Sequence, residues 1–167
     1  MSLHLRQFSP ADHSVVNTIA VAAFSEYRDH YTDWPTVVLR IGEMAALAES
    51  GEIIVAEHAG QVVGAVAYLG PSAPKADFFE PAWAVMRLLV VSPAARGLGV
   101  GKALAQACLT RAREDAATIF ALHTSTMMQV ALPMYERMGF TYLRSAPPIH
   151  GVAYGVYVKP LNQERTI

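Results

Sequence analysis

The chain has a single cysteine, Cys108, among its 167 residues, and one cysteine cannot form an internal disulfide. This fits a reducing compartment, so we expect a cytoplasmic protein. Clustered basic residues are also missing, and the net charge is -1, so the chain lacks the positive surface charge that nucleic-acid binding requires. No apolar run is long enough to span a membrane, and the N-terminus lacks the apolar core of a signal peptide. We therefore expect a protein that binds neither nucleic acid nor a membrane.

Two kinds of reactive site are also missing. The histidines show no spacing typical of metal ligands, so we expect no metal. A Ser-His-Asp order with a nucleophile elbow is absent as well. What the chain does have is 53% apolar and 16% charged residues, a balance typical of a compact globule. The length predicts one domain, residues 1–167.

The apolar patterns predict a mixed α/β fold. Seven segments are typical of strands: 3–8, 52–57, 62–69, 86–91, 118–124, 140–143 and 152–159. Four helices are expected, at 10–24, at 35–49, after the glycines near residue 100, and at 131–138. A turn-rich stretch covers 145–151. The order favours a largely antiparallel sheet of six to seven strands, with one parallel pairing across the third helix.

The most informative segment follows the strand at 86–91. Three glycines at alternate positions, Gly97, Gly99 and Gly101, come after Arg96 and open an amphipathic helix. Backbone N–H groups at a helix N-terminus attract anions, and glycine lets a ligand approach the main chain closely. The pattern therefore indicates a phosphate-binding turn, with a glycine-rich link between strand and helix as the plainer alternative.

Two common nucleotide motifs do not fit this turn. The Walker pattern requires a glycine and a Ser or Thr where the chain has Arg96 and Ala103. The dinucleotide fingerprint requires glycine where the chain has Lys102 or Leu104. The remaining pattern, Arg-x-x-Gly-x-Gly over 96–101, resembles the acyl-CoA loop of the GCN5-related N-acetyltransferase (GNAT) family.

A second segment supports this resemblance. Residues 131–140 resemble the family signature Ala-x-x-x-Tyr-x-x-x-Gly-Phe, with Tyr135 and Gly139 at the matching positions. The helical spacing of the apolar residues and the glycine at the expected helix end agree with it. The resemblance implies a GNAT-like acyl-CoA N-acyltransferase fold over nearly the whole chain.

The resemblance also implies a place for acetyl-CoA, as a co-substrate lying between two strands that splay apart. Strand residues would pair their backbone with the pantetheine arm, and the glycine turn would bind the pyrophosphate through its N–H groups. The implied cofactor-binding residues are Leu89, Val90, Val91, Arg96, Gly97, Leu98, Gly99, Val100, Gly101 and, one position past the match, Lys102.

Tyr135 matches the family residue that faces the thioester sulfur, which implies a role as donor to the departing CoA thiolate. A tyrosine of pKa ~10 and a thiol of pKa ~8.5 make full proton transfer uphill by about 2 kcal/mol. Hydrogen bonding to the thiolate is therefore the better description. Alternatively, Tyr135 is a core aromatic of a packing helix.

The base that deprotonates the amine is left open. Family members often have a glutamate where this chain has Val85. Glu80, which lies further back near the preceding loop, and His123, at the end of the strand at 118–124, are candidates, with Glu26 and Asp29 as others. A second departure is Met128, at a position where the family often has an asparagine that contacts the pantetheine.

The acceptor site is expected between the first two helices, where acids and aromatics alternate over 26–34. Acidic side chains beside aromatic walls attract a cationic amine. The alternative is a solvated acidic helix face. The candidate substrate-binding residues are Glu26, Tyr27, Asp29, Tyr31 and Phe79.

We therefore expect an acetyl-CoA-dependent N-acetyltransferase, in which the primary amine of a small molecule attacks the thioester directly in a ternary complex. Two alternatives stay open: a non-catalytic CoA-binding or sensor module, and a protein acetyltransferase acting on an N-terminal amine or a lysine. A homodimer is one option for assembly, because the sequence does not set the oligomeric state.

Overall fold

The computed structural model describes residues 2–161, which contain a seven-stranded sheet flanked by helices. The strands are β1 (His4–Gln7), β2 (Glu52–His58), β3 (Gln61–Leu69), β4 (Ala84–Val91), β5 (Ile119–Thr124), β6 (Thr141–Ile149) and β7 (Val152–Pro160). The α-helices are α1 (His13–Phe24), α2 (Trp34–Ile41), α3 (Val100–Glu114) and α4 (Ala131–Arg137). Short 3-10 helices are η1 (Pro10–Asp12), η2 (Ser25–His30), η3 (Met44–Glu49) and η4 (Pro93–Ala95). Within residues 2–161, none of the helices is long and apolar enough to cross a membrane.

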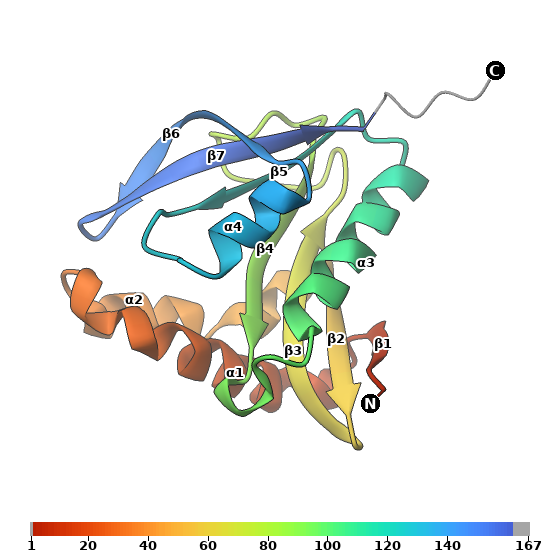
Figure 1. Cartoon of the computed structure of the whole chain (residues 1–167), viewed down its shortest axis with the longest axis vertical. Coiled ribbons are helices and arrows are strands. Elements are labelled where there is room, and N and C mark those ends of the chain that lie inside the picture. The colour runs from red at the N-terminus through yellow and green to blue at the C-terminus, as the bar shows by residue number, and fades with distance from the viewer. Residues whose placement is uncertain (1, 162–167) are drawn as a thin grey trace.

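The strand order is β1-β2-β3-β4-β5-β7-β6. All neighbouring strands are antiparallel except β4 and β5, which are joined through α3 and run parallel. Figure 1 shows β4 and β5 starting side by side and diverging towards their carboxyl ends. The predicted mixed α/β fold, with its single parallel pairing, is confirmed.

The helices cover both faces of the sheet, because the strands carry apolar side chains on both sides. On one face, Val16 of α1 and Val37 of α2 pack against the sheet in a large apolar cluster. On the other face, Leu104 and Cys108 of α3 pack with Phe120 of β5. Sheets buried on both faces read as nearly continuous apolar strands, which is the pattern at 84–91 and 119–122.

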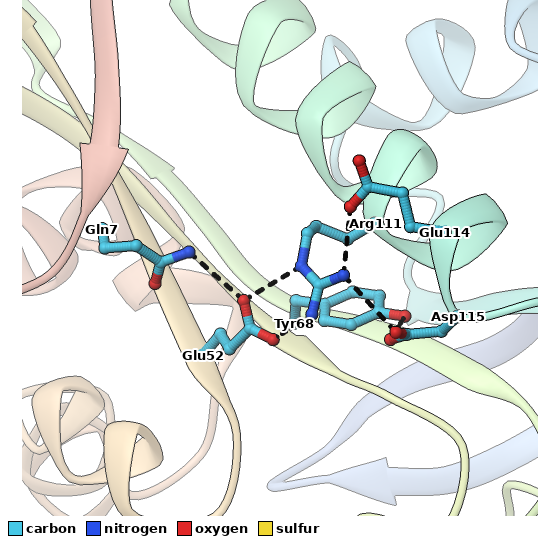
Figure 2. Close-up of polar contacts among 6 residues, drawn as sticks. All are labelled: Gln7, Glu52, Tyr68, Arg111, Glu114 and Asp115. Atoms are coloured by element: carbon cyan, nitrogen blue, oxygen red, sulfur yellow. Dashed lines mark hydrogen bonds and ion pairs between the residues drawn. The ribbon is translucent and has the colours of Figure 1, made fainter.

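A polar network fixes the carboxyl end of α3 against the sheet (Figure 2). The Arg111 guanidinium donates to Glu52 of β2, with 3.1 Å between Nε and Oε1, and lies 5.3 Å from the ring centre of Tyr68 on β3. The Tyr68 hydroxyl donates to Asp115 at 2.7 Å. Because α3 is held at this end, the position of its N-terminus, where the glycines lie, is also set.

The predicted helix at 35–49 is wrong in its second half. The α-helix ends at Ile41, and residues 44–49 form a 3-10 helix instead. The backbone N–H of Ala45 donates to the side-chain oxygen of Asn17 on α1, at 2.7 Å. This amide has therefore left the hydrogen-bond ladder that an uninterrupted α-helix requires.

The turn expected at 145–151 is also largely wrong, because β6 continues to Ile149. The strand keeps pairing with β7, and the register shift between Ala146 and Ile149 absorbs Pro147 and Pro148. β6 is the edge strand of the sheet, where proline is tolerated. The turn itself is restricted to His150 and Gly151, which have φ of 39° and 84°.

Candidate functional site

The site begins where β4 separates from β5. The two strands pair only at their starts, Ala84 with Phe120 and Val85 with Ala121. From there to Val91, the edge of β4 that faces β5 has no strand beside it. Its backbone donors and acceptors are therefore available to a ligand.

A β-bulge changes which side chains β4 presents at this opening. Ala65 of β3 pairs with Val90 and Ala67 pairs with Arg87, so two residues of β4 lie opposite one residue of β3. Leu88, in the bulge, has a φ of 53°. An extra residue breaks the alternation of a strand and redirects its side chains. Arg87 and Leu88 consequently both line one cavity beside the opening.

The glycine turn connects η4 to α3. Gly97 and Gly99 have φ of 84° and 79°, in the left-handed region that favours glycine. A Cβ added at either position would meet nothing within 4 Å, so the space above the main chain is open. The first hydrogen bond of α3 runs from the Ala103 N–H to the Gly99 carbonyl at 3.0 Å. The preceding amides therefore have no acceptor within the helix and point towards this space.

A groove of about 590 Å³ lies along the glycine turn. Eight of the predicted cofactor-binding residues line it: Leu89, Val91, Arg96, Gly97, Gly99, Val100, Gly101 and Lys102. Other lining residues come from the end of α1 and from η2 (Phe24, Glu26 and Tyr27) and from residues 127–131 with Met134. The other two predicted residues do not line the groove. Val90 is buried in the core under α1 and α2, and Leu98 packs against the core under α3.

A second cavity, of about 230 Å³, adjoins this groove. Four residues line both hollows: Phe24, Leu89, Met128 and Ala131. The second cavity brings together Tyr135 of α4, His123 of β5 and Tyr31, which comes from the segment after η2. A long molecule in the groove can therefore meet a small molecule in the cavity.

Tyr135 lies in the wall of the second cavity and is 6% exposed. Its ring packs edge-on against Phe140, with 6.0 Å between the ring centres. Burial raises the pKa of the Tyr135 hydroxyl, so the group is protonated at neutral pH. Among residues 2–161, no side chain or carbonyl accepts a hydrogen bond from this hydroxyl. The O–H is thus available as a donor to a ligand.

His123 is held between aromatic rings. Its ring stacks on Phe78 with 5.0 Å between the centres and lies 5.2 Å from the ring centre of Tyr154. The buried Nδ1 has no hydrogen-bond partner among the described residues. Burial, and secondarily the nearby Arg87 charge, lower the pKa of His123 to about 4. At neutral pH the imidazole is therefore uncharged, with a nitrogen that lacks a protein partner.

Of the other predicted catalytic and substrate-binding residues, some line the second cavity and others lie outside both hollows. Glu80 is exposed, lies outside both hollows, and pairs with Arg144 at 3.8 Å. Phe79 is 3% exposed and packs near His123 without lining either hollow. Tyr31 lines the second cavity, and its hydroxyl is hydrogen-bonded to that of Tyr154.

The acidic segment after α1 does not form an acidic wall in the second cavity. Glu26 and Tyr27 line the groove instead, and Glu26 is ion-paired with Arg96 at 2.9 Å. Asp29 is exposed and lines neither hollow. The sequence interpretation missed Arg87, whose signal is a charged residue inside an apolar strand.

The splayed parallel strand pair, with a glycine turn and a helix N-terminus after its first strand, is the arrangement that the resemblance to acyl-CoA N-acyltransferases implies. The chain belongs to the acetyltransferase (GNAT) family, whose model matches residues 15–140. The predicted family membership is therefore confirmed.

Individual relatives agree with this. N-acetyltransferase 8F1 and N-acetyltransferase family 8 member 2, both from Rattus norvegicus, are 40% and 39% identical over 90 residues. These matches cover 54% of this chain but only 39% and 38% of the two relatives, so the chain aligns with well under half of their length.

Solved structures show the same fold across the chain. A GCN5-related N-acetyltransferase from Rhodopseudomonas palustris has a TM-score of 0.75 at 23% identity, covering 96% of this chain and 97% of that one. An acetyltransferase from Salmonella typhimurium, solved with its cofactor acetyl-CoA, has a TM-score of 0.70 at 16% identity, covering 99% and 98%.

Proposed function

We propose that this acetyltransferase moves the acetyl group of acetyl-CoA to the primary amine of a small molecule. The observation that carries the proposal is the meeting of two hollows. A groove beside unpaired helix amides adjoins a smaller cavity through four shared residues, and Tyr135 lines that cavity. The groove suits a long phosphate-bearing molecule, and the cavity suits a compact acceptor.

The coenzyme would be bound mainly by main-chain groups. The amides of Val100, Gly101 and Lys102, in the first turn of α3, would bind the diphosphate. The free edge of β4 from Leu89 to Val91 would pair with the pantetheine amides as an added strand does. The open space above Gly97 and Gly99 fits such an approach.

In the reaction, the amine nitrogen forms a bond to the thioester carbonyl carbon, and the carbon–sulfur bond breaks. The developing oxyanion is stabilised by backbone N–H groups at the strand opening. Because burial raises the pKa of Tyr135, this residue stabilises the leaving thiolate by a hydrogen bond rather than by giving up its proton.

The acceptor must react as a neutral amine. An alkylammonium of pKa ~10.4 is only about one part in 10³ to 10⁴ neutral at pH 7. His123 lines the cavity as an uncharged imidazole, so it adds no positive charge that would oppose deprotonation of the amine. The proton of the amine passes to solvent water, because His123, with a pKa of about 4, does not keep it.

Direct transfer is favoured over a covalent acyl-enzyme. Cys108 is buried on α3, and burial raises the pKa of its thiol. A thiol that is not ionised is a poor nucleophile. The amine therefore attacks within a ternary complex.

The test uses Gly101→Ala. A Cβ at Gly101 would lie 3.7 Å from Val91 and 3.9 Å from Leu89, which are ordinary contacts. Alanine should therefore leave the free protein folded, or stabilise it by up to about 1 kcal/mol. It should also weaken CoA binding roughly tenfold, because the methyl group blocks close approach to the main chain.

Calorimetric titration with CoA, ATP and NAD measures the affinity, and thiol release across an amine panel measures turnover. Binding of ATP or NAD but not CoA would overturn the proposal, as would a Gly101→Ala protein with unchanged CoA affinity. CoA binding without thiol release on any amine would favour the non-catalytic sensor instead.

A further inference from the structure

The second cavity contains an arginine without a partner. Arg87 lines this cavity next to the β4 bulge, where it is half-buried. Burial lowers the pKa of its guanidinium, and no carboxylate contributes to that pKa. Among residues 2–161, its side chain makes no hydrogen bond or ion pair.

This isolation is unusual among the half-buried arginines of residues 2–161; the exposed Arg40 and Arg137 also lack a partner there, but water solvates them. Arg6, Arg96 and Arg111 each donate to a carboxylate at 3.1 Å or less, and Arg144 lies 3.8 Å from a Glu80 oxygen. A buried cation is costly when it is unpaired. These features are expected of an arginine whose ion-pair partner is a bound ligand.

The surroundings of Arg87 set the charge of that ligand. Among residues 2–161, the cavity is lined by four basic or potentially basic residues, Arg40, Arg87, His123 and His150, and by no aspartate or glutamate. The acids expected to attract an amine are elsewhere: Glu26 is paired with Arg96, and Asp29 is exposed. An acceptor that carries only an ammonium group would meet an uncompensated positive charge here.

Building on the proposed acetyltransferase function, we propose that the acceptor is an amino acid with an apolar side chain, whose carboxylate is bound by Arg87. The planar guanidinium matches a carboxylate through two parallel hydrogen bonds. The amine then lies towards Tyr135 and His123, which line the same cavity. The remaining wall, including Val37, Ile41 and Ile149, is apolar and receives the side chain.

The volume agrees with this class of acceptor. A cavity of about 230 Å³ is below the range of about 300 to 1,000 Å³ that is typical for drug-sized ligands. It suits one amino acid rather than a folded protein segment. An amino acid also carries one positive and one negative charge, so it adds no net charge to the cavity beside Arg87.

The experiment compares matched acceptors in the thiol-release assay with acetyl-CoA. The pairs are phenylalanine with 2-phenylethylamine, and leucine with 3-methylbutylamine, which differ only by the carboxylate. For the wild-type protein we expect kcat/KM to be at least about tenfold higher for the amino acid of each pair.

Arg87→Met should raise the KM for the amino acids about thirtyfold or more and abolish the preference. Arg87→Lys keeps the charge but not the paired donors, so it should restore part of the preference. Arg28→Gln removes the same charge from an exposed residue that lines neither hollow, and it should change nothing. Melting curves and CoA titrations establish that each variant is folded.

The outcomes separate the two proposals. Turnover that favours the decarboxylated amines, or that keeps its preference in Arg87→Met, overturns the role of Arg87 and leaves the acetyltransferase function standing. If no acceptor is turned over, the proposed function fails, and titration of phenylalanine into the CoA-saturated protein then tests Arg87 directly. Binding that is equal in wild type and Arg87→Met, or absent from both, overturns the inference.

Discussion

The guanidinium of Arg96 donates to the carboxylate of Glu26, at 2.9 Å from Nη2 and 3.4 Å from Nη1. This contact joins the glycine turn to η2, the segment that follows α1, across the mouth of the groove. Both side chains are about half exposed, at 48% and 44%. An exposed pair of this kind contributes little to stability, in the range of about 0 to 1 kcal/mol. Its larger effect is on the groove, because a carboxylate competes with any phosphate for Arg96.

Replacing the acid of this pair should improve coenzyme binding. In Glu26→Gln, Arg96 is released and one negative charge is removed from the groove, so we expect CoA to bind about two- to threefold more tightly. Calorimetric titration at low and at high salt measures this, and the gain should shrink as salt is added. Asp29→Asn is the matched control, since it removes the same charge from an exposed position outside the groove. Weaker binding in Glu26→Gln would show that the ion pair helps to shape the site.

Removing the hydroxyl of Tyr135 should affect turnover alone. The O–H has no partner among the described residues, so Tyr135→Phe should leave the melting temperature and the affinity for CoA nearly unchanged. Loss of a donor to the leaving thiolate should lower kcat by about tenfold to a hundredfold. Steady-state thiol release and CoA titration measure the two quantities separately. Tyr142→Phe, on the exposed edge strand, is the control. A normal kcat in Tyr135→Phe would assign the residue to the core alone.

Local patterns in the sequence predicted the parts of the fold that depend on neighbouring residues. The glycine turn is contiguous, and its two left-handed positions, Gly97 and Gly99, are both glycines in the sequence. The apolar pattern of β4 and of α3 likewise depends on residues within one element. The parallel pairing of β4 with β5 followed from the helix between them.

Features that depend on distant residues could not be predicted in this way. The end of α2 is decided in part by Asn17, 28 residues before the Ala45 amide that it binds. The continuation of β6 depends on its pairing with β7. The bulge at Leu88, which brings Leu88 to the same side of β4 as Arg87, can be seen only in the register with β3. No pattern within β4 alone indicates that register.

The stability of the protein should fall in mildly acidic solution because of His123. Its pKa is lowered to about 4 in the folded chain, compared with about 6.5 when unfolded. Above pH 6.5 both states are neutral and there is no penalty. Between pH 6.5 and about 4 only the unfolded state gains the proton, so the free energy of unfolding should decrease by about 3 kcal/mol in total. Below about pH 4 both states are protonated and the penalty stays constant.

Denaturant unfolding at a series of pH values measures this loss, and His123→Phe is the informative comparison. The variant cannot titrate at this position, and its ring suits the aromatic surroundings of Phe78 and Tyr154. It should therefore lose clearly less stability than the wild type between pH 6.5 and 4. Asp12, whose pKa is lowered to about 2 by Arg6, acts below this window and is shared by both proteins. Parallel curves for the two proteins would show that His123 is not kept neutral by the fold.

Arg87 provides a way to separate binding from folding by a stability measurement. If the guanidinium has no partner until the carboxylate of the ligand binds, the free protein is destabilised by a half-buried charge that no described residue compensates. Arg87→Met removes the charge but keeps a side chain of similar length, so it should stabilise the free protein by about 1 kcal/mol. For a chain of this size this corresponds to a rise in melting temperature of about 2 to 4 °C.

The contrasting variant is Arg6→Met, because Arg6 donates to Asp12 at 2.8 Å and 3.0 Å and to Glu57 at 2.8 Å. Removing Arg6 leaves two carboxylates without their partner and should cost about 1 to 3 kcal/mol. Thermal unfolding without ligand should therefore move in opposite directions for the two variants. A drop in melting temperature for Arg87→Met as large as that for Arg6→Met would show that Arg87 supports the fold, and its assignment to the acceptor carboxylate would fail. A rise, together with lost turnover of amino acids, is the behaviour expected of a residue kept for its ligand at the expense of stability.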